Sequence, residues 1–200
     1  MPLDHDATTR RRPMKSLFGR LLARRDGATA IEFAILAIPF FVIVFASIET
    51  FVAFTGEQLL ANATETMARK IRTGEIRPGT SAQQQEQEFR TAFCEEIKIL
   101  MRCSAEEIAT PNKLFLDVRH FPDYASIPAT VPLIDTDLDT SGFKIDPGGK
   151  KSINIVRAYY RWDIVTDLVR PLLSNIKTQN GSRQNYLMVA TAVVQNEDYP

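Results

Sequence analysis

The sequence has few of the residues that most often build metal and catalytic sites. Its 200 residues include two histidines, two cysteines and one tryptophan. His5 lies near the N-terminus, and His120 lies alone on a predicted strand, where a structural or surface role is favoured over catalysis. A tetrahedral metal centre needs four such ligands, and His120 is the only histidine near the two cysteines in the sequence. We therefore expect neither a metal site nor a cofactor.

Sequence motifs of enzymes are also missing. The chain has no nucleotide-binding loop, nucleophile elbow or metalloprotease signature. A run of alternating carboxylates could hold calcium, and it contains Asp135, Asp137, Asp139 and Asp146. The run lacks the distal glutamate of an EF-hand, which favours a solvated loop. The formal net charge of zero gives no argument for nucleic-acid binding. The sequence predicts a protein that is not an enzyme, although it could be an enzyme's substrate.

One long apolar segment dominates the N-terminal part of the chain. Between Ala28 and Phe54 the only charged residues are Glu32 and Glu49. At about 1.5 Å per residue, a helix from Gly27 to Glu49 covers roughly 33 Å, which is enough for a hydrocarbon core of about 30 Å. A cleaved secretory signal is the main alternative, but its apolar region is typically about 7 to 15 residues long. The sequence therefore predicts a single membrane-spanning helix.

The charge around this segment predicts its orientation. After this segment, no lysine or arginine follows until Arg69. Before it lie seven basic residues: Arg10, Arg11, Arg12, Lys15, Arg20, Arg24 and Arg25. Because basic flanks stay in the cytoplasm, we expect residues 55–200 on the other side of the inner membrane.

Helical spacing continues beyond the span through Leu60, Ala63, Met67 and Ile71. The predicted helix ends at Thr73, where Gly74 can supply a left-handed cap, and Pro39 should kink the helix or loosen one turn.

The remainder of the chain predicts an α+β domain with a mainly antiparallel sheet. Alternating or β-branched residues predict strands over 114–121, 152–162 and 186–195. Ser81 and Gln84 suggest a capping box for a helix to about Leu100. Residues 163–176 are predicted to form a helix or part of one, interrupted by Pro171. The predicted divisions are a basic leader (1–27), a transmembrane helix (28–54), its continuation (55–74) and the outer domain (75–200).

The residues around the start of the apolar segment resemble a known family. Gly27, Ala-Thr-Ala-Ile and then Glu32-Phe33 resemble the cleavage motif of prepilins of the tight-adherence (Flp, type IV) system. A longer pattern is similar to the TadE-like pseudopilins of that system. Besides the cleavage motif, this pattern includes Pro39, Glu49-Thr50-Phe51, Gln58, Ala61 and the run from Ala68 to Gly74. The resemblance implies cleavage after Gly27 by a membrane aspartic peptidase. It also implies the pilin arrangement of a long helix before a sheet.

Cleavage would give Glu32 a specific role. The new amine would lie on Ala28, four residues before Glu32 and on the same helical face. An ionised carboxylate inside a bilayer is costly unless it is paired, and in pilins, as the resemblance implies, the partner amine belongs to the neighbouring subunit. Alternatively, Glu32 merely reaches to water at the cytoplasmic edge. Phe33 replaces the tyrosine usual in major Flp pilins, which favours a minor subunit. Glu49 is interpreted as a boundary residue.

Cys94 and Cys103 lie on the side assigned outside the cytoplasm, and that compartment favours a disulfide. Nine residues of straight helix would separate them by about 13.5 Å, whereas a disulfide needs Cα atoms within about 7 Å. If they pair, the helix must therefore end or turn before Cys103. Ser104 with Glu107 could cap a new turn just after it, which fits such a break. The alternative is two buried thiols.

Two function classes follow from these observations. The first is a minor pilin-like subunit needed to assemble tight-adherence pili, with a prepilin peptidase, the inner membrane and other pilin or pseudopilin subunits as partners and no nucleic acid. The second is an uncleaved single-pass envelope protein whose outer domain binds a partner or ligand. Cleavage after Gly27 distinguishes the two classes.

Overall fold

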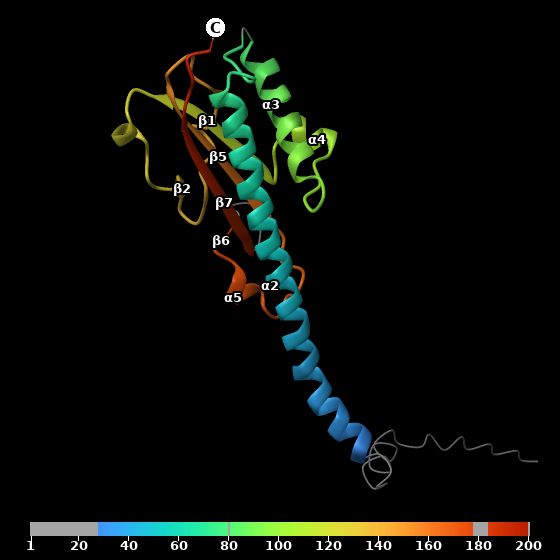
Figure 1. The fold of residues 1–200 in the computed structure, drawn as a ribbon. Coiled ribbons are helices and arrows are strands. Elements are labelled where there is room, and N and C mark those ends of the chain that lie inside the picture. The colour runs from blue at the N-terminus through green and yellow to red at the C-terminus, as the bar shows by residue number, and fades with distance from the viewer. Residues whose placement is uncertain (1–27, 80, 178–183, 200) are drawn as a thin grey trace, which may run out of the picture. The chain divides into compact units, whose positions relative to one another are not determined.

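The computed structural model describes residues 28–79, 81–177 and 184–199 (Figure 1). The first element within these ranges is helix α2, Ala28–Arg72, which continues through Pro39. The chain divides between Phe45 and Ala46 into two parts. Of the first part, the described residues form only the beginning of α2. The second part contains the rest of α2 and all the other elements.

Helix α2 ends as the sequence predicts. Its last turn is basic, and Gly74 follows with φ of 74°. The N–H of Gly74 donates to the carbonyl of Ile71 at 3.0 Å, and the N–H of Glu75 donates to the carbonyl of Lys70 at 2.9 Å. These bonds satisfy carbonyls that the helix end would otherwise leave open. The cap turns the chain back toward helix α3, Ala82–Ile97.

We expect Gly74→Ala to lower the free energy of unfolding by about 1 to 3 kcal/mol, because an alanine is strained at this positive φ. A Cβ atom there would also lie 2.6 Å from the ring of Tyr199. Urea unfolding of the detergent-solubilised protein, followed by Trp162 fluorescence, measures the loss. Gly142→Ala is the control, since a Cβ at Gly142 meets nothing within 4 Å. Equal stability of the two variants would contradict the argument.

Helix α3 is shorter than predicted, and the capping box predicted at its start does not form. Ser81 is the N-cap residue but makes no side-chain cap bond. Gln84 donates to Glu88 along the helix, and the side chain of Gln85 bonds Gly79 and Arg77 in the preceding loop. This side-chain contact with the loop stabilises the helix start instead. The cap predicted at Ser104 is present: its hydroxyl accepts from the N–H of Glu107 at the start of α4, Ala105–Ala109.

A five-stranded sheet has the order β4-β1-β5-β7-β6. Its strands are β1 (Leu114–Phe121), β4 (Ile145–Asp146), β5 (Ile153–Trp162), β6 (Ile176–Lys177) and β7 (Gln184–Gln195). Only the short β1–β4 pairing is parallel. A separate hairpin joins β2 (Leu133–Ile134) to β3 (Asp137–Leu138), after the 3₁₀ turn η2 (Tyr124–Ser126). The predicted class, an α+β domain with a mainly antiparallel sheet after a long apolar helix, is confirmed.

The main core lies between this sheet and helices α2 and α3, which cover one of its faces (Figure 1). The side chains predicted to continue the helical stripe, Leu60, Ala63, Met67 and Ile71, are all buried there. A smaller cluster on the opposite face contains Leu138, Tyr159, Ile176 and Leu187. Strand β5 contributes to both clusters, which explains why eight consecutive residues from Ile153 are buried.

The segment 163–176, predicted as a helix or part of one, is helical only in part. Only α5, Arg170–Leu173, is helical, and Pro171 lies in its first turn, where a missing N–H costs least. Before it, residues 163–169 follow an irregular path. The reason lies in long-range contacts, because two backbone N–H groups of this segment bind a side chain of α2.

Candidate functional site

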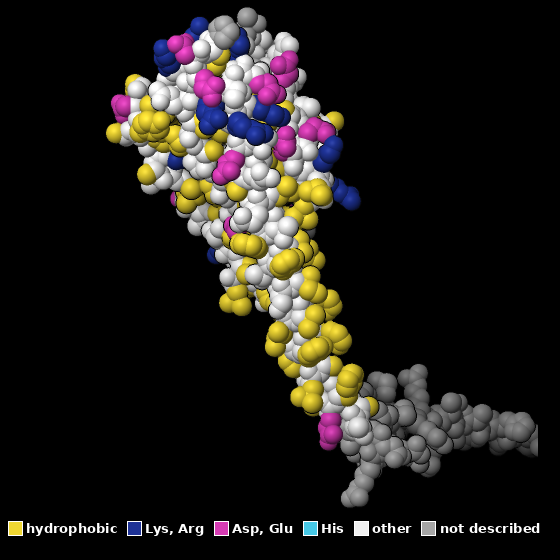
Figure 2. All heavy atoms as spheres, in the orientation of Figure 1, with side chains coloured by type: hydrophobic (Ala, Val, Ile, Leu, Met, Phe, Trp, Pro, Cys, Tyr) yellow, Lys and Arg dark blue, Asp and Glu magenta, His cyan; other side chains and the backbone are white. Residues whose placement is uncertain are grey.

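The beginning of α2 presents an apolar surface. Phe33 and Leu36 are each 70% exposed, and Figure 2 shows hydrophobic side chains covering the face of α2 in view. Rings pair along the helix, Phe40 with Phe41 and Phe41 with Phe45. An 18-residue window of α2 has a mean hydropathy of 2.5 and none of it is buried. Among the described residues, this is the one helix long and apolar enough to cross a membrane, as in a single-pass membrane protein.

Each residue predicted for cleavage and assembly falls at or near the start of α2. Gly27 and the basic leader lie outside the described residues, and Ala28 is the first residue of the helix. Glu32 and Phe33 are both exposed, one turn further along. Since residues four apart share a helical face, Glu32 lies on the face of Ala28. The helix thus offers a carboxylate on its surface within an apolar sequence.

Glu49 is more than a boundary residue. Its two carboxylate oxygens accept hydrogen bonds from the backbone N–H groups of Val165 and Thr166, the latter at 3.0 Å. Bonds from N–H groups to a carboxylate are stronger than those between neutral groups. Two such bonds attach the segment before α5 to α2 at one helical position.

A second carboxylate lies two turns further along α2. Glu57 accepts a hydrogen bond from the hydroxyl of Tyr186, on β7, at 2.5 Å. This bond, helped by burial and by the charge of Glu57, raises the pKa of Tyr186 to about 12. The hydroxyl of Tyr186 therefore stays protonated, and continues to donate, to a higher pH than that of an ordinary tyrosine. At the far end of the same strand, the N–H of Glu197 donates to the carbonyl of Arg72 at 2.9 Å, and their side chains form an ion pair at 3.5 Å.

Glu49 and Glu57 lie on the wall of a pocket of about 300 Å³. Its lining is mainly apolar and comes from α2, from the end of β5, from the segment around α5 and from β7; it includes Ala53, Phe54, Trp162, Ile164, Leu172 and Tyr186. Trp162 is the only tryptophan in the chain. The pocket therefore brings together two acidic residues of α2, the tryptophan and Tyr186.

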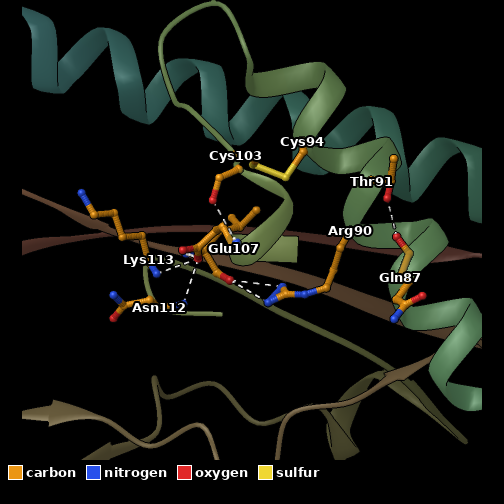
Figure 3. The surroundings of a disulfide bond; sticks show 10 residues. Gln87, Arg90, Thr91, Cys94, Cys103, Glu107, Asn112 and Lys113 are labelled. Carbon is orange, nitrogen blue, oxygen red and sulfur yellow. Dashed lines mark hydrogen bonds between the residues drawn. A yellow bond between two sulfur atoms is a disulfide. The ribbon is translucent and has the colours of Figure 1, made fainter. Parts of the chain in front are cut away.

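Cys94 and Cys103 form a disulfide in the structure, with Cα atoms 5.7 Å apart (Figure 3). Helix α3 ends at Ile97, which lets the chain turn back. Close to the disulfide, Glu107 accepts from three successive backbone N–H groups at the start of β1, those of Asn112, Lys113 and Leu114. The disulfide and Glu107 together connect α3, α4 and β1.

The buried Arg90 of α3 lies near this disulfide. It donates two hydrogen bonds to the carbonyl of Leu114, at 3.0 and 3.2 Å. Burial lowers the pKa of its guanidinium, and the charges of Glu86 and Glu107 oppose that shift. Arg90 therefore adds another connection between α3 and β1.

Three of the four aspartates of the candidate calcium loop have separate partners. Asp137 pairs with Arg161 at 2.7 Å, Asp146 pairs with Lys144 at 2.7 Å, and Asp139 accepts from Ser141. His120 is exposed beside Asp146, with its Nδ1 3.3 Å from the carbonyl oxygen of that residue. Within the described residues, no three metal-ligating side chains gather at one place.

Sequence reasoning missed the contacts that attach α2 to the rest of the domain. Glu49 and Glu57 look like ordinary polar positions, because their partners lie more than 110 residues away. The one available signal was the position of Glu49 inside an otherwise apolar run. The side-chain amides of Asn154 and Asn196 bond each other at 2.9 Å beneath the loop that contains Gly148. No pattern in the sequence indicated this contact.

Comparison with known proteins identifies one family. A model described as TadE-like protein matches residues 27–69. No curated protein matches the chain, and no solved structure matches it. The matched segment begins at the glycine of the proposed cleavage motif and ends inside α2. Residues 27–69 are therefore TadE-like, consistent with a protein of the tight-adherence pilus system, and the resemblance seen in the sequence is confirmed over this segment.

Proposed function

We propose that this chain is a minor pilin-like subunit needed to assemble tight-adherence pili, and that a prepilin peptidase cleaves it after Gly27. The observation that carries the proposal is the surface of α2. An exposed apolar helix with a carboxylate one turn from its start continues without a break into a domain whose core it helps to form. Such a helix can pass from the membrane into a fibre with its domain attached.

Glu32 and the amine of Ala28 supply the assembly contact in this proposal. In lipid, a carboxylate is stabilised by an opposite charge, and an amine freed by cleavage is a suitable partner. The apolar side chains around Glu32, including Phe33, would pack against the helices of neighbouring pilin or pseudopilin subunits. The Glu32–amine pair would fix the depth at which two helices pack.

The topology belongs to the same proposal. The basic leader stays in the cytoplasm, α2 crosses the inner membrane once, and the sheet domain lies in the periplasm. From that position the subunit can enter a pilus or support its assembly. It acts as a peptidase substrate and a structural subunit rather than as an enzyme. The uncleaved envelope-binding protein is the competing outcome.

The test is the N-terminus of the membrane-bound protein. Expressed beside its prepilin peptidase, the wild-type chain should begin at Ala28. Gly27→Leu should keep the leader and lose surface pili, because the larger side chain blocks the peptidase and the amine of Ala28 never forms. Gly142→Leu is the matched control, since residue 142 lies in an exposed turn with open space around it. A wild-type chain that still begins at Met1 in piliated cells would favour the uncleaved envelope protein.

A further inference from the structure

The segment between β5 and β6 exposes large apolar side chains beside the apolar part of α2. In residues 163–173, called the apolar loop below, Val165 is 85% exposed, Leu168 71% and Leu172 84%. Ile164 and Val169 of the same loop are buried. Inward-facing side chains thus already fill the local core. The three exposed ones need another explanation, because large apolar side chains gathered on a surface mark a contact.

The apolar loop is attached to α2 at a defined height. Glu49 binds the N–H groups of Val165 and Thr166, and Leu172 lies with Ala53 and Phe54 on the wall of the pocket. On α2 itself, Ile48, Phe51 and Phe54 are exposed at this height. The exposed side chains of the loop therefore continue the apolar surface of the helix sideways.

That height corresponds to the edge of the membrane. Residues 28–48 cover about 31 Å as a helix, the thickness of a hydrocarbon core. The polar layer beyond the hydrocarbon is about 5 to 8 Å thick on each side, and residues 49–54 cover about 8 Å. The neighbouring aromatic residues, Trp162 and Tyr186, are the two types enriched in that layer.

The backbone of the apolar loop suits a weakly hydrated position. Besides the two N–H groups bound by Glu49, the carbonyl of Ile164 accepts from Arg170, and that of Thr166 accepts from the N–H groups of Val169 and Arg170. Backbone groups near lipid need such partners because water is scarce. The acidic side chains are paired as well, Asp163 with Lys113 and Asp167 with Arg170, both at 2.6 Å.

We infer that the apolar loop lies in the headgroup layer of the membrane that α2 crosses, with Val165, Leu168 and Leu172 directed into the lipid. The inference rests on the membrane span of the proposed function and not on cleavage or pilus assembly. Lipid is favoured over another protein because the loop continues the surface of the spanning helix. Glu49 holds the loop at that depth, so the subunit has a second contact with the bilayer beside its helix.

The experiment uses spin labels on the full chain in vesicles of phosphatidylethanolamine and phosphatidylglycerol. Labels are attached at Leu168→Cys and Leu172→Cys, while Cys94 and Cys103 are protected by their disulfide. Collision rates with oxygen, which concentrates in lipid, and with a water-soluble nickel chelate are compared. Leu133→Cys is the matched control, because this leucine is also exposed but lies in the separate hairpin. Phe41→Cys reports the span itself.

The ratio of oxygen to chelate collisions should be several-fold higher at 168 and 172 than at 133. Ratios equal to that at 133, with a high ratio at 41, would overturn the inference and leave the membrane span intact. Labels that are in water at low protein density and shielded only at high density would indicate a contact between subunits, which also overturns it. Adding Glu49→Ala should raise label mobility at 168 and lower its ratio; unchanged values would contradict the role of Glu49.

Discussion

Cells that carry Glu32→Ala should lose their surface pili while the protein still inserts into the inner membrane. Removing a charge from the span makes insertion easier, so the variant should reach the membrane at wild-type levels. Assembly should fail because, in the proposed function, the helix loses the carboxylate that pairs with the neighbouring amine. Counting pili by electron microscopy and measuring attachment to a surface, beside the amount of membrane-bound protein, separates these effects.

Glu65→Ala is the control for this experiment. It makes the same change on an exposed face of the same helix, beyond the apolar segment. Cells that carry it should make pili at the wild-type level. Wild-type numbers of pili with Glu32→Ala would show that the carboxylate merely reaches to water, and the assembly role would then be wrong. Loss of pili with both variants would indicate a general requirement for charge on α2 rather than a specific pair.

Removing the disulfide should cost the domain about 2 to 4 kcal/mol of unfolding free energy. The double variant Cys94→Ser, Cys103→Ser leaves no unpaired thiol, and its urea midpoint should fall well below that of the oxidised wild type. The physical reason is that the bond restricts the unfolded chain between α3 and α4. Trp162 fluorescence of the detergent-solubilised protein follows the transition.

A reducing agent provides the internal control. It should lower the midpoint of the wild type toward that of the double variant and leave the double variant unchanged. Alkylation before reduction should find no reactive thiol in the wild type. Two alkylated cysteines in the protein taken from the periplasmic side would contradict both the disulfide and the compartment assigned to the domain.

Local patterns predicted the long elements of the fold well. Strand β1 has the predicted bounds, and β5 differs by one residue at its start, because alternating or β-branched residues extend over their whole length. The stripe of Leu60, Met67 and Ile71 predicted the buried face of α2 for the same reason. Patterns of this kind depend on neighbours in the sequence, so a single chain is enough to read them.

Features that depend on distant partners could not be predicted. Residues 163–169 have helical spacing, but Glu49 takes two of their N–H groups, and a side chain 116 residues away leaves no trace in the local sequence. Strands β2, β3, β4 and β6 are two residues long, too short for an alternating pattern. In the candidate site, the sequence indicated Glu32 through its apolar surroundings, whereas the role of Glu49 appeared only in three dimensions.

The attachment of β7 to α2 at both ends has a mechanical consequence. Tyr186 binds Glu57 near one end of the strand, and Glu197 binds Arg72 beyond the other, so the two ties are separated by about 22 Å along the helix. Between these contacts, the buried side chains from Leu60 to Ile71 pack in the main core. Two contacts this far apart resist tilting of the domain against the helix, because any tilt must stretch one of them. A torque applied to the domain by flow or surface contact is therefore passed to the helix with little loss of angle.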